Sequence, residues 1–228
     1  MKRYGFLALT LTAALTVACN SNDHRDTTAA NPPAGGAVGT AGNDNVSSGD
    51  KDFVKDIASA SIAEVELGRM ALDKAANPDV KKFAQMMVDD HTKANEELTN
   101  FASQSNIPVP SATDDKHNDL RDKLAQKTGA DFDKDYMDAM VDGHKDVMDK
   151  LESRIDKDTL SKYKADAQDP SGKKVETKVE AKTVTPEKSD NPVTMGLNSW
   201  AAKTYPVVSA HYDAAKKLQD AVKKRMTN

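Results

Sequence analysis

Residues 77–91 read NPDVKKFAQMMVDDH and contain the start of a helix and a candidate functional side chain. Asn77 is typical of the residue that caps a helix, Pro78 suits the first helical position, and Asp79 places an acid in the first turn. From there apolar residues recur at steps of three and four, the period of a helix that is buried along one side. The stretch therefore predicts an amphipathic helix that carries His91 on its apolar face.

The same spacing recurs along much of the chain. Proline inside a helix removes a backbone hydrogen bond, so Pro206 is expected to kink the last helix. Four long amphipathic helices and a short one predict an all-α protein, a ferritin-like four-helix bundle with one short accessory helix, flanked by disordered segments. The predicted helices cover about residues 51–76, 78 to the Ile107-Pro108 break, 114–127, 131–156 and 193–226.

Each long helix places one acidic or imidazole side chain on its apolar stripe. Glu64 lies 13 residues before Asn77, and His91 lies 14 residues after it. If these two helices pack antiparallel, both side chains lie ~20 Å from the turn and face each other. His144 and His211 lie near the middle of their own helices. The sequence thus predicts a polar cluster at one level of the bundle.

A short internal repeat supports this cluster. Met87-Val88-Asp89-Asp90-His91 matches Met140-Val141-Asp142-Gly143-His144. In both copies Met and His share a helix face, whereas the Asp two residues before each His points away and is expected to be solvated. The side chains predicted to surround the ligands as an outer layer are Asp90, Met87 and Met140.

Three imidazoles and one carboxylate suit a single transition-metal ion, with Zn, Fe and Cu as candidates. The predicted ligands are Glu64, His91, His144 and His211. A di-iron centre is disfavoured, because valine stands three residues before each His, where Glu-x-x-His pairs would need glutamate. Two alternatives stay open. One is a structural or interaction protein of the cell envelope with a buried polar network, and the other is an oxidase or hydrolase, for which the sequence shows no catalytic nucleophile pattern.

The first 18 residues have the layout of a bacterial export signal. A basic start at Lys2-Arg3 precedes an uncharged apolar run and small residues before Cys19. The run is too short for a stable membrane span, which needs ~20 apolar residues. Leu15-Thr16-Val17-Ala18-Cys19 resembles a lipobox, so Cys19 is predicted to carry lipid. As the only cysteine, it cannot form an intramolecular disulfide.

Composition divides the remaining chain into three parts. Residues 19–49, rich in small and polar residues, predict a flexible tether behind the lipid anchor. Residues 50–228 form the expected bundle domain, interrupted at 165–191 by a low-complexity, solvated insertion. Asn20 after Cys19 favours the outer membrane, facing the periplasm. The net charge of -4, with both signs interleaved, gives no basic surface for nucleic acid. The membrane is an expected partner through the lipid anchor, and the sequence does not identify a protein partner.

Several stretches resemble one bacterial protein family. They are Ile62–Ala71, Val80–His91, Phe132-Asp133 with His144, and Tyr205–His211, and they are similar to the domain-of-unknown-function family 4142. The similarity covers roughly residues 50–160 and 193–223. It implies a ferritin-like bundle in the outer membrane or periplasm, and no established activity. The insertion at 165–191 departs from the compact family pattern.

The function predicted from these features is that of a lipid-anchored periplasmic bundle. Its inward His and Glu side chains are expected to bind one transition-metal ion. Such a protein would serve in envelope metal handling or stress protection.

Overall fold

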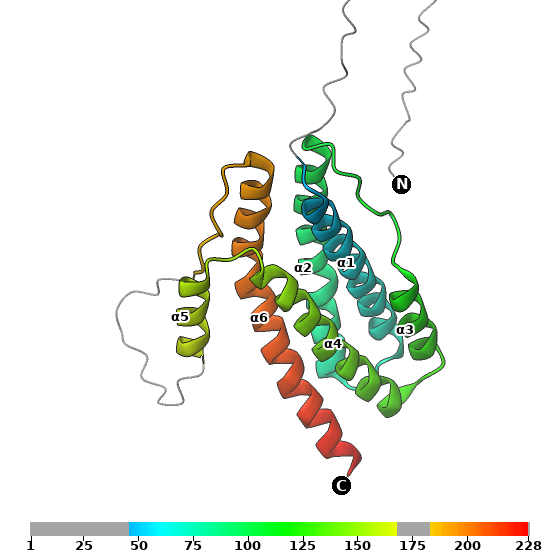
Figure 1. Ribbon diagram of the computed structural model, residues 1–228. Helices are drawn as coiled ribbons and strands as arrows, with labels where there is room; N and C mark the ends of the chain where they lie inside the picture. The colour runs from blue at the N-terminus through cyan, green and yellow to red at the C-terminus, as the bar shows by residue number, and fades with distance from the viewer. Residues whose placement is uncertain (1–45, 168–182, 228) are drawn as a thin grey trace, which may run out of the picture. The chain divides into compact units, whose positions relative to one another are not determined.

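The computed structural model describes residues 46–167 and 183–227. Across these ranges the chain forms six helices and no strand (Figure 1). The all-α prediction is confirmed, and the five predicted helices lie close to their expected bounds. The helices are α1 (Ser48–Lys74), α2 (Pro78–Gln104), α3 (Asp115–Ala125), α4 (Gly129–Glu152), α5 (Lys157–Ala167) and α6 (Pro192–Met226).

Side-chain caps begin three of the long helices. The Asn77 side chain accepts a hydrogen bond from the Asp79 amide at the start of α2, as the sequence predicts. Asn191 caps α6 in the same way, and Pro192 takes the first helical position. Ser47 caps α1. These caps fix where each helix begins and therefore which side chains reach the middle of the bundle.

The four long helices form the bundle as two pairs. α1 packs on α2 and α4 packs on α6, with further contacts of α1 to α4 and of α2 to α6 (Figure 1). The short α3 lies against α1 and α4. α6 continues through Pro206 and changes direction along its length, as a proline inside a helix requires.

Buried apolar side chains form two clusters, and a polar layer separates them. Along α1, Ile57 belongs to one cluster and Leu67 to the other, with Glu64 between them. The same order holds for His91 between Leu98 and Met87 on α2, for His144 between Val147 and Met140 on α4, and for His211 between Val208 and Ala215 on α6. The four residues singled out from the sequence thus mark a common level of the bundle.

A close contact brings α1 and α2 together beside this layer. A Cβ atom at Gly68 would lie 2.9 Å from Val88 Cγ2 and 3.1 Å from the Ala84 carbonyl oxygen. Only glycine fits without a shift of the neighbouring helix. Glu64, one turn earlier on the same face, is therefore held close to α2.

A buried ion pair ties three helices together at one end of the bundle. Asp50 is 1% exposed and accepts hydrogen bonds from Arg154, just after α4, and from Thr194 in the first turn of α6. The Arg154 guanidinium also lies over the Phe53 ring, 4.5 Å from its centroid. Loss of one partner of a buried pair costs about 3–5 kcal/mol, so this contact fixes how α1, α4 and α6 lie along one another.

The segment after α4 differs from the prediction. α5 forms where no helix is predicted, and its Tyr163 ring packs against Tyr205 of α6 with centroids 5.5 Å apart. Within the predicted solvated insertion, residues 183–191 are mostly exposed, but Val184 is buried and Pro186 pairs with Ile155 in a β-bridge, so part of the segment packs on the bundle. A single valine with no periodic neighbours carries no signal of such a tertiary contact.

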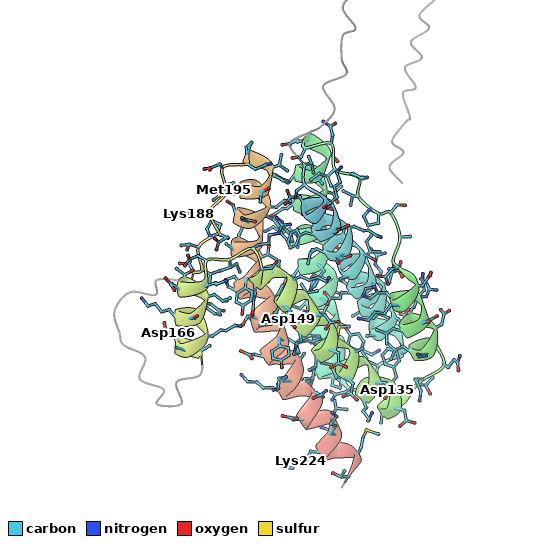
Figure 2. All side chains as sticks on the ribbon, in the orientation of Figure 1. Asp135, Asp149, Asp166, Lys188, Met195 and Lys224 are labelled. Carbon is cyan, nitrogen blue, oxygen red and sulfur yellow. The ribbon has the colours of Figure 1, made fainter. Side chains whose placement is uncertain are left out.

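The predicted export signal, Cys19 and the tether up to residue 45 lie outside the described residues. Of the helices in the ranges 46–167 and 183–227, none combines the length and the apolar character that crossing a membrane requires. Charged side chains such as Asp149, Lys188 and Lys224 lie on the outside of the fold (Figure 2).

Candidate metal centre

Glu64, His91, His144 and His211 meet in the polar layer, each from a different long helix. Their exposed fractions are 5%, 6%, 0% and 3%, respectively. The centroids of the three imidazole rings are 5.4 to 5.5 Å apart in every pair. The predicted convergence of these side chains at one level is confirmed.

The Glu64 carboxylate lies beside two of the imidazoles. Its Oε2 atom is 2.7 Å from His91 Nδ1, and its Oε1 atom is 3.3 Å from His144 Nδ1. Both are contacts at ion-pair distance, and neither oxygen has an aligned hydrogen-bond partner among the described residues. One carboxylate therefore lies beside two of the three rings.

Hydrogen bonds also position one ring nitrogen each of His144 and His211, and these two nitrogens, with His91 Nδ1 beside Glu64, are called the outer nitrogens. The Nδ1 atom of His144 is 2.8 Å from the Met140 carbonyl oxygen, one helical turn earlier. His211 Nε2 is 2.9 Å from Asp90 Oδ2. A carbonyl or carboxylate oxygen only accepts, so each of these ring nitrogens carries the proton. In the neutral ring the second nitrogen is then left with a free lone pair.

The second ring nitrogens are buried and have no hydrogen-bond partner in the part of the chain that the structure describes. They are His91 Nε2, His144 Nε2 and His211 Nδ1. One ring nitrogen from each histidine lies within 4.8 Å of one from each of the other two. In metal sites, a ligating His almost always gives its other ring N–H to a carboxylate or a carbonyl. The three histidines have this arrangement.

Burial and charge set the protonation states of the cluster. Burial would raise the pKa of Glu64, but the positive charge available on His144, His91 and His211 lowers it to about 2. Burial favours the neutral ring and lowers the pKa of His144. Burial, together with His91 and His144, also lowers the pKa of His211 to about 4. For His91 the attraction of Glu64 outweighs burial and raises the pKa.

A family model described as DUF4142, a domain of unknown function, matches residues 36–180. The chain belongs to the DUF4142 family. The matched stretch includes Glu64, His91 and His144, whereas His211 lies beyond it on α6. The helix that completes the cluster in this DUF4142 protein is therefore supplied from outside the matched region.

Among solved structures, a silver-bound form of CopM, obtained by co-crystallization, is similar to this DUF4142 protein. The sequence identity is 19% and the TM-score is 0.47, over 75% of this chain and 96% of that chain. No curated protein matches the chain. Silver belongs to that structure, so the case for a metal centre here depends on the residues of this chain alone.

Of the three residues predicted to surround the ligands, one contacts a ligand through its side chain. Asp90 does orient a histidine, through its contact with His211. Met87 and Met140 instead place their side chains in an apolar cluster, and Met140 reaches His144 through its backbone carbonyl. Glu64, predicted to be a ligand, contacts Nδ1 of both His91 and His144, and the group of mutually close candidate ligands in the described ranges contains the three histidines without it.

Two further residues of the centre carry no sequence signal of their own. Ser61 of α1 donates a hydrogen bond from its hydroxyl to the His91 carbonyl oxygen, over 3.0 Å, and so links two helices. Tyr136 has a buried hydroxyl without a hydrogen-bond partner among the described residues, and its pKa is raised by burial and by the charge of Glu64. A serine or a tyrosine on an apolar stripe has the pattern of ordinary core.

In the metal-free protein, the three histidines should titrate at clearly different pH values. We expect His91 to titrate above the ordinary value of about 6.5 and His211 near 4. As pH falls below 6.5, the unfolded chain protonates His211 while the folded chain does not, so this residue's contribution to stability falls between pH 6.5 and about 4. Imidazole NMR signals followed against pH measure the three values, and three coincident values near 6.5 would contradict the electrostatics.

Proposed function

We propose that this DUF4142 protein is a lipid-anchored envelope protein that binds one transition-metal ion through His91, His144 and His211, in metal handling or stress protection. The observation that carries the proposal is the buried, partnerless ring nitrogen on each of the three histidines. One ring nitrogen of each histidine lies within 4.8 Å of one from each of the other two, and the second nitrogen of each ring contacts Glu64, Met140 or Asp90.

A plain hydrogen-bonded core network fits these atoms less well. A buried polar atom without a partner costs about 1–3 kcal/mol, so polar cores are normally built from groups that satisfy one another. Here His144 and His211 each have one ring nitrogen bonded to a carbonyl or carboxylate oxygen, and His91 has one beside the Glu64 carboxylate, whereas the second nitrogen of every ring has no partner among the described residues. A cation with empty orbitals would satisfy all three of these second nitrogens together.

The donor set defines the class of metal. Imidazole suits Zn, Fe and Cu, and no thiolate is available because the only cysteine is Cys19. In a tetrahedral site with metal–nitrogen bonds of about 2.0–2.1 Å, ligand nitrogens lie about 3.3 Å apart. The rings must therefore close in from their present spread of up to 4.8 Å when the ion binds. Ionised Glu64 supplies negative charge next to two of the ligands.

One ion fits better than two. Ferritin-like di-iron centres use several carboxylates together with Glu-x-x-His pairs. Valine stands three residues before each of the three clustered histidines, at Val88, Val141 and Val208. Glu64, the carboxylate buried in the layer, already contacts two imidazoles.

The location in the envelope rests on the N-terminal sequence. We expect the wild-type protein to be labelled by radioactive fatty acid and to fractionate with membranes, because Cys19 ends a lipobox-like run. Cys19→Ser should lose the label and become soluble or stay unprocessed. Equal labelling of the two proteins would contradict lipidation at this residue.

Metal binding should raise thermal stability, and His144 should be required for this effect. A ligand that binds only the folded state adds about 2.7 kcal/mol at a hundredfold excess over its Kd. We expect the melting temperature of chelator-treated protein to rise on addition of Zn, Cu or Fe, and His144→Gln to lose the rise. Calorimetry with and without metal measures both.

His117→Gln is the matched control for this experiment. His117 lies on α3, with Nδ1 2.6 Å from an Asp114 carboxylate oxygen, outside the polar layer. We expect this variant to keep the wild-type response to metal. If wild-type protein melts at the same temperature with and without each ion, and His144→Gln is destabilised equally in both cases, the cluster is a structural network.

A further inference from the structure

The three histidines leave a bound ion with a position that the protein does not fill. Glu64 is engaged with the outer nitrogens of His91 and His144, and Asp90 with that of His211. Neither carboxylate belongs to the group of mutually close ligand atoms, which contains only the three histidines within the described ranges. A four-coordinate ion held by three protein ligands keeps its fourth position for water or an exogenous ligand, as in catalytic zinc sites.

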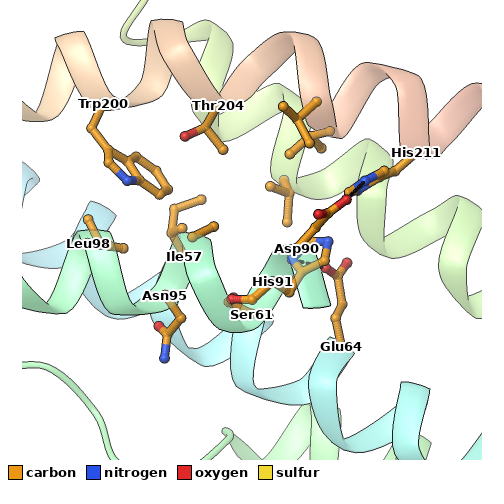
Figure 3. A pocket seen from close by; sticks show the side chains of 14 residues that line it. Ile57, Ser61, Glu64, Asp90, His91, Asn95, Leu98, Trp200, Thr204 and His211 are labelled. Carbon is orange, nitrogen blue, oxygen red and sulfur yellow. Dashed lines mark hydrogen bonds and ion pairs between the residues drawn. The ribbon is translucent and has the colours of Figure 1, made fainter. Parts of the chain in front are cut away.

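A small cavity lies beside two of the ligands. It is lined from α1, α2, α4 and α6, includes His91 and His211, and has a volume of about 30 Å³ (Figure 3). A space of ~10–15 Å³ on this measure already holds one water molecule. The cavity is therefore large enough for a ligand of two or three atoms and too small for a metabolite.

The lining is mostly apolar, although Ser61, Asn95 and Thr204 also contribute to it. Ile57, Leu98 and Val208 are among the buried aliphatic side chains that form its walls. Trp200, which is 9% exposed, also lines it, and its buried indole N–H has no hydrogen-bond partner among the described residues. Figure 3 shows Trp200 and His211 at opposite ends of the pocket.

We propose that this pocket admits a small exogenous ligand of two or three atoms, of the azide or dioxygen class, which occupies the open position of the metal ion. The inference rests on the proposed metal site and adds to it. An ion enclosed on all sides by protein would need no such space. A cavity lined by two of the ligands provides the space that a small ligand on the ion requires.

Azide added to the copper-loaded protein tests this inference. Azide bound to Cu(II) produces a new charge-transfer band, so we expect a saturable change in the visible spectrum of the wild-type protein. Ala94 lines the cavity and does not contact the ion through a donor atom. In Ala94→Val two added methyl groups fill the space, and about tenfold more azide, or greater, should be needed for half-saturation. Its affinity for copper, measured by chelator competition, should stay at the wild-type value.

Ala139→Val is the matched control. Ala139 is a half-buried alanine on a long helix, as Ala94 is, but it lines a different groove. Its azide titration should equal that of the wild type. Val208→Ala provides a second test if Ala94→Val does not fold, because it widens the cavity and should bind azide at least as tightly as the wild type.

The possible outcomes separate the two proposals. If the wild-type protein does not bind copper, zinc or iron, the metal site and the pocket inference both fail. If copper binds but azide leaves the spectrum unchanged, the metal site stands and the open position is wrong. Equal azide affinity in the wild type and Ala94→Val, with copper bound in both, would show that azide reaches the ion by another route and would overturn the pocket.

Discussion

The contact of the Glu64 carboxylate with two imidazoles is the constraint on which the polar layer depends. A charged carboxylate in a helix bundle is costly unless positive or polar groups compensate it. His91 and His144 provide that compensation at 2.7 and 3.3 Å, and they hold the pKa of Glu64 at about 2. The same contact turns the free nitrogens of both rings away from the carboxylate. The same contact therefore compensates the charge of Glu64 and orients the two histidine rings.

The fold places this interaction where water is scarce. An apolar cluster lies on each side of the layer, the close approach at Gly68 brings α1 against α2, and the Asp50–Arg154 pair fixes the far end of three helices. A helix shifted by one residue would turn its histidine off the shared face. The two apolar clusters therefore supply most of the packing in the bundle, and they set the geometry of the polar layer between them.

The sequence predicted those features that repeat with helical period. Helix bounds, the N-cap at Asn77 and the common level of His91, His144 and His211 all follow from spacing. The contacts of Glu64 with His91 and His144 could not be predicted in this way. Spacing places a side chain on a helix face, but it does not specify which ring nitrogen that side chain contacts. α5 and the packing of Val184 were missed for a related reason: they depend on single tertiary contacts to the end of α4 and to α6.

Anomalous diffraction from crystals of the metal-loaded protein tests the central claim most directly. We predict one anomalous peak in the polar layer, at bonding distance of about 2.0–2.1 Å from His91 Nε2, His144 Nε2 and His211 Nδ1. The Glu64 carboxylate should remain at the outer nitrogens. A peak elsewhere in the molecule, or one at which Glu64 replaces a histidine as ligand, would contradict the account.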